Sequence, residues 1–244
     1  MLFDFEERLS ASPFVERIWC AQSERTGDFL SVAASQWEMV VSTYQGQTTI
    51  TVRGPETRVT PMHVSLLGAE FFGIIFRYGA FMPRFPVGGL VDADLDLPDA
   101  SSKSFWLSGS AWQFPNYENA DTFVERLVKE DLLVCDPIIE PVLRGEPQEL
   151  SPRSVQRRFV QATGLTQGSI RKIERARYAT ILLQQGVSIL ETVEQAGYSD
   201  QAHLTRSLKH RLEKHLLKSS TKVSLSSCRF CSRQSLLPEL SFMC

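Results

Sequence analysis

The chain has 244 residues, which is enough for two domains of about 100 residues each. Its net charge of −2 hides two opposite parts, because residues 1–150 carry 11 Lys and Arg against 22 Asp and Glu, whereas residues 151–218 carry 12 against 5. This imbalance is typical of a basic nucleic-acid-binding segment joined to an acidic segment with a separate task. The sequence has no apolar run of the roughly 18 residues that a membrane span needs and no secreted-type cysteine pattern, so we expect a cytoplasmic protein outside the membrane.

Residues 1–118 are predicted to form a β-rich regulatory or sensor domain. Four segments alternate in polarity or run apolar between turn residues, as strands do: 37–44, 48–54, 63–68 and 72–81. Short strands at this spacing favour a sandwich or a small barrel. Five aromatic residues are expected in its core, although they leave open an apolar pocket: Trp37, Phe71, Phe76, Trp106 and Trp112.

We predict no metal, no cofactor and no catalytic site in this domain. His63 is the only histidine before residue 203, and a single histidine is more often structural than a metal ligand. Asp92, Asp94 and Asp96 alternate, but the sequence lacks the glycine and the closing glutamate of a calcium loop at the required spacing. It also lacks a nucleophile motif, a phosphate loop and a paired-acid arrangement, so we do not expect an enzyme.

A helical bridge is predicted over residues 119–149. Asp121 is placed to cap a first helix. The apolar side of that helix carries Phe123, Leu127 and Val128. Pro137 and Gly145 bracket a second, short helix, which contains Ile138, Ile139, Val142 and Leu143. We expect the bridge to pack beneath the next segment as its scaffold, and a role in dimer contacts is the alternative.

Residues 150–167 hold the first of two helix-turn-helix patterns. Ser151 is an N-cap candidate, Pro152 suits the first helical position, and Gly164 ends the helix. The packed face is predicted to consist of Val155, Phe159 and Val160. Four polar side chains are expected to stay exposed and to contact DNA: Arg153, Gln156, Arg157 and Arg158. Gln156 and Arg157 have the geometry to read base edges, and Arg158 is expected to contact a phosphate.

A helical connector is predicted over residues 168–186. Its apolar residues recur at helical spacing, and they are Ile170, Ile173, Ala176, Ile181 and Leu182. About 19 residues at about 1.5 Å each span about 28 Å, close to the roughly 34 Å between successive major grooves on one face of DNA. The connector can therefore hold two reading helices about one turn of DNA apart. Four cations along it can add phosphate contacts: Arg171, Lys172, Arg175 and Arg177.

The second helix-turn-helix pattern spans residues 187–209. Ile189, Val193 and Ala196 form an apolar stripe, which Gly197 ends. Ser199 is the expected N-cap of the next helix. In that helix Leu204 and Leu208 are one turn apart and are expected to pack inward. Six other residues lie on or beside its outward face and are predicted to meet DNA: Gln201, Ala202, His203, Thr205, Arg206 and Lys209.

Residues 150–209 resemble the DNA-binding domain of AraC/XylS-type transcriptional regulators. The resemblance is carried by SPRSVQRRFVQATGLT, by the connector IERARYATILLQQG and by AGYSDQAHLTRSLK. It implies an α+β protein in which a mainly β sandwich or cupin-like barrel precedes an all-α double helix-turn-helix domain. It also implies a sequence-specific regulator of transcription, either an activator or a repressor, that binds double-stranded DNA. A small-molecule effector, a homodimer and contact with RNA polymerase stay open.

The end of the chain departs from that family. We assign the DNA-binding domain to residues 150–218, although the family's Gly-x-Ser/Thr-Pro stretch is missing after the second recognition helix. Residues 219–244 contain 8 serines and three cysteines and are predicted to be a disordered or frame-altered tail. The alternative function is therefore a regulatory or protein-interaction module with impaired DNA binding. A zinc site in this region has the right ligand types but no supporting apolar framework; its ligands would be His210, His215, Cys228 and Cys231.

Overall fold

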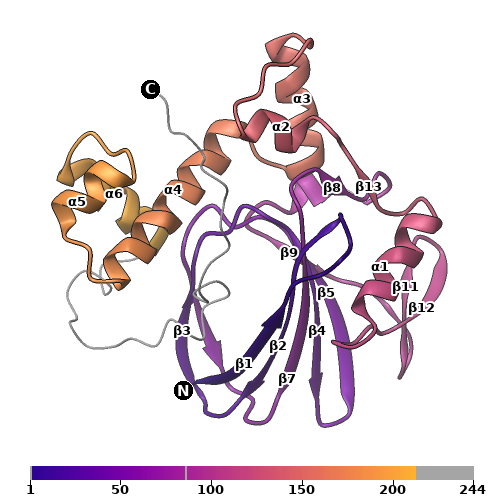
Figure 1. Cartoon of the computed structure of the whole chain (residues 1–244). Coiled ribbons are helices and arrows are strands. Elements are labelled where there is room, and N and C mark those ends of the chain that lie inside the picture. The colour runs from indigo at the N-terminus through magenta and orange to yellow at the C-terminus, as the bar shows by residue number, and fades with distance from the viewer. Residues whose placement is uncertain (1, 86, 213–244) are drawn as a thin grey trace.

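The computed structural model describes residues 2–85 and 87–212, and it has the α+β composition that the sequence predicts (Figure 1). A β-rich N-terminal part precedes a helical C-terminal part. The strands are β1 (Phe3–Arg8), β2 (Val15–Ser23), β3 (Gly27–Ser31), β4 (Glu38–Tyr44), β5 (Gln47–Arg53), β6 (Thr60–Val64), β7 (Glu70–Phe76), β8 (Ala80–Phe81), β9 (Asp94–Asp96), β10 (Asp99–Ser101), β11 (Ser104–Leu107), β12 (Ser110–Gln113) and β13 (Val134–Cys135). The helices are α1 (Ala120–Lys129), α2 (Ile139–Leu143), α3 (Pro152–Thr163), α4 (Gln167–Gln184), α5 (Ile189–Gln195) and α6 (Gln201–Leu212), with a short 3-10 helix η1 at Val87–Leu90.

The main sheet has six antiparallel strands in the order β1-β2-β7-β4-β5-β9. Three small sheets accompany it: β3 with β6, β8 with β13, and β10-β11-β12. The β4–β5 hairpin follows from its turn residues, because Gln45 and Gly46 have φ values of 49° and 78°, the left-handed pair that a two-residue hairpin turn needs. The strands predicted at residues 37–44 and 48–54 are thus confirmed to within one residue at each end.

Both faces of the main sheet are covered by apolar side chains, which alternate between the faces as strand geometry requires. One face, with Met39 and Ile74, packs into a large core with α1, β11 and β12. The opposite face carries the smaller cluster of Trp19, Val40 and Ile75, which lies across a cavity from β3 and β6. Because both faces are buried, the central strands contain nearly continuous apolar runs.

Two of the predicted strands differ from those in the structure. The strand expected at residues 72–81 is divided into β7 and β8 by a turn at Gly79. Here φ is +88°, and a Cβ would lie 2.8 Å from the carbonyl oxygen of Asp136, so glycine is required for both reasons. The strand expected at residues 63–68 ends at Val64, and β6 begins earlier, at Thr60. The strands β1–β3 and β10–β12 are not among those predicted from the sequence.

Most of the aromatic residues expected in the core are buried, and Asp92 of the acidic segment holds a loop. Trp37, Phe76 and Trp112 are buried as predicted, whereas Trp106 is 46% exposed. Asp92 accepts hydrogen bonds from the backbone N–H and the hydroxyl of Thr57, each at 2.7 Å. Among the described residues, no three His, Cys, Asp or Glu side chains gather as metal ligands. The zinc alternative of the sequence analysis depends on side chains outside the described part of the chain.

The two helices of the bridge pack in different places. α1 begins after Asn119 and is not capped by Asp121, whose carboxylate instead accepts a hydrogen bond from Arg8 at 2.7 Å. The apolar side of α1 packs into the core of the β-rich part. α2 lies in a core of the helical part, where Ile139 packs in one cluster with Phe159 of α3. The scaffold role predicted for the whole bridge is therefore found in α2 and not in α1.

α4 is shared by two cores of the helical part. Ile170 and Ile173, in its first half, pack in the cluster of Phe159 and α2. Ala176 and Leu182, in its second half, pack with α5 and α6. Figure 1 shows α4 running from α2 and α3 at one end to α5 and α6 at the other. Along the described part of the chain, no helix combines the length and the apolar character that crossing a membrane requires.

A short segment after β3, residues 32–35, connects the β-rich part to the helical part. Val32 packs in the cluster of α4, α5 and α6, and Ala33 packs in the cluster of α2, α3 and α4. The hydroxyl of Ser35 donates a hydrogen bond to the carboxylate of Glu174 in α4. Because this segment contacts both helical cores, the position of α4 depends on the position of β3.

Glu56 attaches the same segment to the main sheet. It exchanges two backbone hydrogen bonds with Ala34, at 2.7 and 2.9 Å, and its carboxylate accepts a third from Ser31 at 2.7 Å. Burial raises the pKa of Glu56 from 4.5 to about 6, although the Ser31 hydrogen bond acts in the opposite direction. Because the folded state then binds this proton more tightly than the unfolded chain, the free energy of unfolding falls as the pH rises from about 4.5 to 6.

Glu56→Gln is therefore expected to raise the free energy of unfolding at pH 8 by up to about 2 kcal/mol, with little change at pH 4. The glutamine keeps an oxygen that can accept the Ser31 hydrogen bond. Urea unfolding at both pH values measures the effect, and the same change at the exposed Glu70 is the control. An equal gain at pH 4 and pH 8 would show that ionisation of Glu56 is not its cause.

Candidate nucleic-acid interface

The first candidate reading helix, α3, is delimited as its sequence predicts. Ser151 lies in an extended conformation, and its hydroxyl accepts a hydrogen bond from the N–H of Ser154, while Pro152 occupies the first turn. Gly164 ends the helix with φ of +72°. A Cβ at Gly164 would also lie only 2.9 Å from the Cα of Gly88 in η1. The end of α3 is thus held closely against the β-rich part.

One face of α3 is exposed. Its residues follow each other at intervals of three and one, so that they lie side by side on the helix. They are Arg153, Gln156, Arg157, Val160 and Gln161. The prediction that Val160 is packed is wrong, because it is 43% exposed, whereas Phe159 is buried as predicted, together with Ala162. Gln161, which the sequence analysis did not select, adds a fourth polar side chain to this face.

Arg158 is not on the exposed face. Its guanidinium forms two hydrogen bonds with Asp136, from Nε at 2.7 Å and from Nη2 at 2.8 Å, and the Asp136 side chain is largely buried. This paired geometry joins α3 to the segment before α2. The expectation that Arg158 contacts a phosphate therefore does not agree with the structure. Asp136 lies 22 residues from Arg158 in the sequence, and no local sequence pattern predicts their contact.

α4 has the length that the connector needs. Its 18 residues correspond to about 27 Å, and the hydroxyl of Thr166 caps its first turn by accepting from the N–H of Ser169. Of its four cations, Arg171 and Lys172 are exposed. Arg175 instead lies over the ring of Tyr198 at 4.5 Å and donates to the carbonyl of Gly197, and Arg177 forms an ion pair with Glu174 at 3.6 Å. Two of the four cations are therefore exposed, and the other two contact neighbouring groups of the helical part.

α5 is short and carries a complete capping box. The Ser188 hydroxyl accepts from the N–H of Glu191 at 3.3 Å, and the Glu191 carboxylate accepts from the N–H of Ser188 at 3.2 Å. The Glu191 carboxylate also accepts a hydrogen bond from the Ser188 hydroxyl at 2.7 Å, and this bond together with the one from the Ser188 N–H lowers the pKa of Glu191. The predicted buried stripe is partly wrong, because Ile189 is 42% exposed and Thr192 is buried, whereas Ala196 is buried as predicted. Helical periodicity is compatible with either stripe, and the packing partners decide between them.

α6 is the second candidate reading helix. Gly197 takes the predicted left-handed conformation, with φ of +66°, but the cap of α6 is Asp200 and not Ser199. The Asp200 carboxylate accepts from the N–H of His203 at 2.6 Å, and this bond holds the pKa of Asp200 below its ordinary value. Leu204 and Leu208 are buried as predicted.

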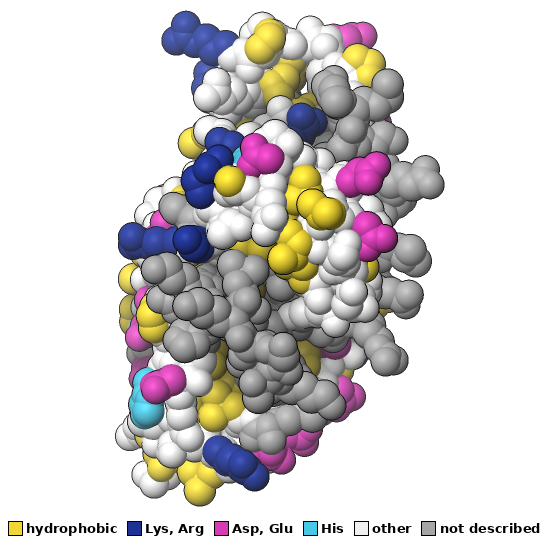
Figure 2. Space-filling view, turned by 90° about the vertical axis from the view of Figure 1, so that its left-hand side faces the viewer, with side chains coloured by type: hydrophobic (Ala, Val, Ile, Leu, Met, Phe, Trp, Pro, Cys, Tyr) yellow, Lys and Arg dark blue, Asp and Glu magenta, His cyan; other side chains and the backbone are white. Residues whose placement is uncertain are grey.

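The outward face of α6 contains most of the residues predicted to meet DNA. Gln201, Ala202, Arg206 and Lys209 are exposed, and Thr205 is partly buried beside them. His203 packs against the turn between α5 and α6. Its Nδ1 lies 3.1 Å from the Ser199 hydroxyl, and its ring meets Tyr198 edge-on with 5.1 Å between the ring centroids. Figure 2 shows Lys and Arg side chains recurring along one edge of the molecule, from the top to the middle of the view.

Substitution of Ser188, which caps α5, and of Ser199, which was expected to cap α6, tests the assignment of these helix caps. Ser188→Ala is expected to lower the free energy of unfolding by about 1 kcal/mol, because an N–H at the start of α5 loses its acceptor. Ser199→Ala is expected to have a smaller effect, because its hydroxyl contacts only the side chains of Asp200 and His203 in the structure's described part. Thermal unfolding of the two variants compares them. A larger loss for Ser199→Ala would place the cap where the sequence analysis expected it.

Comparison with known proteins supports a helix-turn-helix assignment for the helical part of the chain. Residues 149–215 match a family described as a helix-turn-helix domain, and the match contains all of α3, α4, α5 and α6. It supports a helix-turn-helix of the AraC type and DNA binding in transcription regulation. A comparison with curated proteins and with solved structures gave no match.

Proposed function

We propose that this protein is a sequence-specific transcriptional regulator that inserts α3 and α6 into two successive major grooves of one DNA duplex. The observation that carries the proposal is the presence of a capped helix with an exposed polar face at each end of α4. α4 is about 27 Å long, so with its flanking turns it suits grooves about 34 Å apart. A monomer can then read both grooves.

Base reading is assigned to the arginine and glutamine side chains of the two exposed faces. Arg157 and Arg206 have the paired donors that match guanine, and Gln156 and Gln201 can pair with adenine. Arg153, Gln161, Ala202 and Thr205 complete the two faces. Arg171, Lys172 and Lys209 are assigned to phosphates, which fix the position of the protein without reading sequence. His203 supports the turn before α6, and Arg158 supports α3.

The β-rich part is assigned a regulatory task, which AraC-type regulators give to a cupin-like barrel. In this chain the task would act through residues 32–35, which contact both helical cores. A cytoplasmic location, a small-molecule effector, a homodimer and contact with RNA polymerase belong to the same proposal. Equilibrium DNA binding at several salt concentrations tests its electrostatic part, because the affinity should fall steeply as salt rises. A salt-independent affinity would contradict groove binding by the basic face.

The alternative of an interaction module with impaired DNA binding rests on residues 213–244, which lie outside the described part of the chain. A variant in which this segment is replaced by a Gly-x-Thr-Pro ending tests it. If the chain as it stands is impaired, the variant will bind a given duplex more tightly. Equal binding by both chains would remove this alternative.

A further inference from the structure

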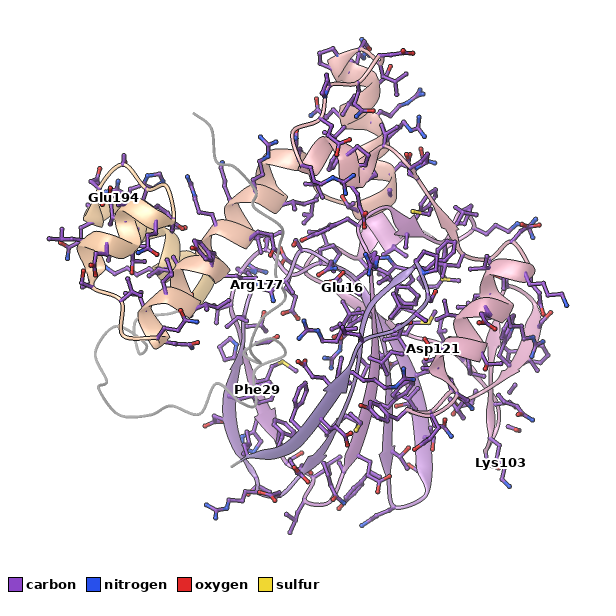
Figure 3. All side chains as sticks on the ribbon, viewed as in Figure 1. Glu16, Phe29, Lys103, Asp121, Arg177 and Glu194 are labelled. Atoms are coloured by element: carbon purple, nitrogen blue, oxygen red, sulfur yellow. The ribbon has the colours of Figure 1, made fainter. Side chains whose placement is uncertain are left out.

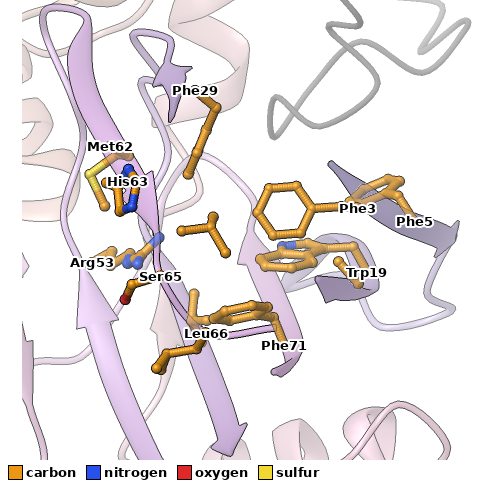
Figure 4. A pocket seen from close by; sticks show the side chains of 13 residues that line it. Phe3, Phe5, Trp19, Phe29, Arg53, Met62, His63, Ser65, Leu66 and Phe71 are labelled. Carbon is orange, nitrogen blue, oxygen red and sulfur yellow. The ribbon is translucent and has the colours of Figure 1, made fainter. Parts of the chain in front are cut away.

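A cavity of about 180 Å³ lies between the main sheet and the β3–β6 pair. Aromatic rings form much of its wall, and they belong to Phe3, Phe5, Trp19, Phe29 and Phe71 (Figure 4). Gly73 makes room for one of them, because a Cβ there would lie 2.2 Å from the indole of Trp19. The rings are therefore arranged around an open space, instead of filling it as they would in a core. An apolar cavity of about 150 Å³ accepts a benzene ring, so this one has room for one or two fused rings.

A cationic side chain, Arg53, lies on the other side of the cavity, beside His63, whose Nδ1 is 2.6 Å from a carboxylate oxygen of Asp28. In Figure 4, Arg53 and His63 face the rings of Phe3 and Trp19 across the space. Arg53 forms an ion pair with the buried Glu38, whose Oε1 lies 4.0 Å from Nη1, which is too far for a hydrogen bond. Glu38 instead accepts a hydrogen bond from the indole N–H of Trp19 at 3.1 Å. The Arg53 guanidinium therefore has donors that a ligand can use.

We propose that this cavity binds an apolar carboxylic acid that carries one or two rings. Its ring lies among the aromatic side chains, and its carboxylate accepts hydrogen bonds from Arg53. Ring-to-ring contact and a charge-assisted hydrogen bond together favour this class over a neutral or a cationic ring compound. The inference names an effector class for the proposed function, and the binding itself does not depend on DNA.

The position of the cavity also suggests how an occupant acts on the helical part. Phe29 belongs to β3 and lines the cavity, and the chain continues from β3 directly into residues 32–35. Val32 and Ala33 pack in the two helical cores that share α4, and Ser35 is hydrogen-bonded to Glu174 of α4. A bound acid that restricts the motion of β3 will therefore also restrict the motion of α4. α4 in turn sets the distance between α3 and α6.

Isothermal titration of the full chain without DNA tests the site, with 2-naphthoate, 2-naphthamide, 2-naphthylmethylammonium and octanoate as probes. We expect 2-naphthoate to bind, and the amide and the ammonium ion to bind about 10- to 100-fold more weakly, the value of one charge-assisted hydrogen bond. Octanoate should also bind more weakly, since it lacks the rings. In Arg53→Gln the acid and the amide should bind alike. Failure of 2-naphthoate to bind, or equal binding of acid and amide to the unaltered chain, would overturn the proposal.

Ala21→Phe is a second test, because it adds a ring inside the cavity and removes no core contact. It should weaken 2-naphthoate binding more than about 10-fold, as expected when a ligand's space is filled. The same change at the exposed Ala111 of β12 is the matched control and should leave binding unchanged. Amide hydrogen exchange in α4 reports the link to the helices and should slow when 2-naphthoate binds. Unchanged exchange in α4 would overturn the link, and neither measurement depends on the DNA-binding proposal.

Discussion

Phe159→Ala is expected to lower the free energy of unfolding by about 3–5 kcal/mol, the usual cost of removing a buried ring and leaving a cavity. Phe159 is fully buried, and its cluster joins α2, α3, the first half of α4 and Ala33 of the connecting segment. Its loss therefore affects the support of the first reading helix and its attachment to the β-rich part. Urea unfolding followed by circular dichroism measures the change.

The neighbouring residue provides the control for this experiment. Val160 follows Phe159 in the same helix but is 43% exposed, so Val160→Ala should change the free energy of unfolding by less than about 1 kcal/mol. The two variants share their position along α3 and differ in the face on which the side chain lies. A similar loss for both would show that the face of α3 has been assigned wrongly.

Arg157→Ala and Arg206→Ala are each expected to weaken binding to a preferred duplex by about 1–3 kcal/mol, which is about 5- to 150-fold, and to relax the base preference at one position. The reason is that each guanidinium lies on the exposed face of its helix and can pair with one guanine. Gel shifts at fixed salt measure the affinity for duplexes that differ at single positions.

Lys103→Ala controls for the change in net charge. Lys103 is exposed between β10 and β11, away from the helical part of the molecule (Figure 3). It removes one positive charge, as the arginine variants do, but should leave the affinity and the base preference unchanged. If Lys103→Ala weakens binding as much as Arg157→Ala, the arginine acts through overall charge and not through a base contact.

The helical part could be predicted well from the sequence because its signals are local. Ser151 and Pro152 begin α3, Gly164 ends it, and Gly197 follows the end of α5, each through the conformation of a single residue. Leu204 also lies in the core as its spacing indicates. These features depend on residues within one or two turns of each other, so they can be recognised without knowing the tertiary structure.

Features that depend on residues far apart in the sequence could not be predicted from local patterns. The pairing of Arg158 with Asp136 joins two segments 22 residues apart, and it removes from the interface a side chain that local spacing had placed there. The cavity depends on strands from β1 to β7. β1 does alternate apolar and polar residues from Phe3 to Glu6, as a strand does, but the pairing of distant strands that encloses the cavity is not a local feature of the sequence. Ile189 shows a third limit, because the periodicity of α5 permits more than one buried stripe.

The central claim is that α4 holds two reading helices in register on one duplex. Selection of bound sites from random duplexes, followed by insertion of five base pairs between the two halves of the selected site, tests this claim most directly. We predict a site of two parts whose centres lie about one helical turn apart, and a large loss of affinity after the insertion, since about half a turn rotates one half-site to the opposite side of the DNA. A folded protein that prefers no duplex over bulk competitor, or that tolerates the insertion, would contradict the claim.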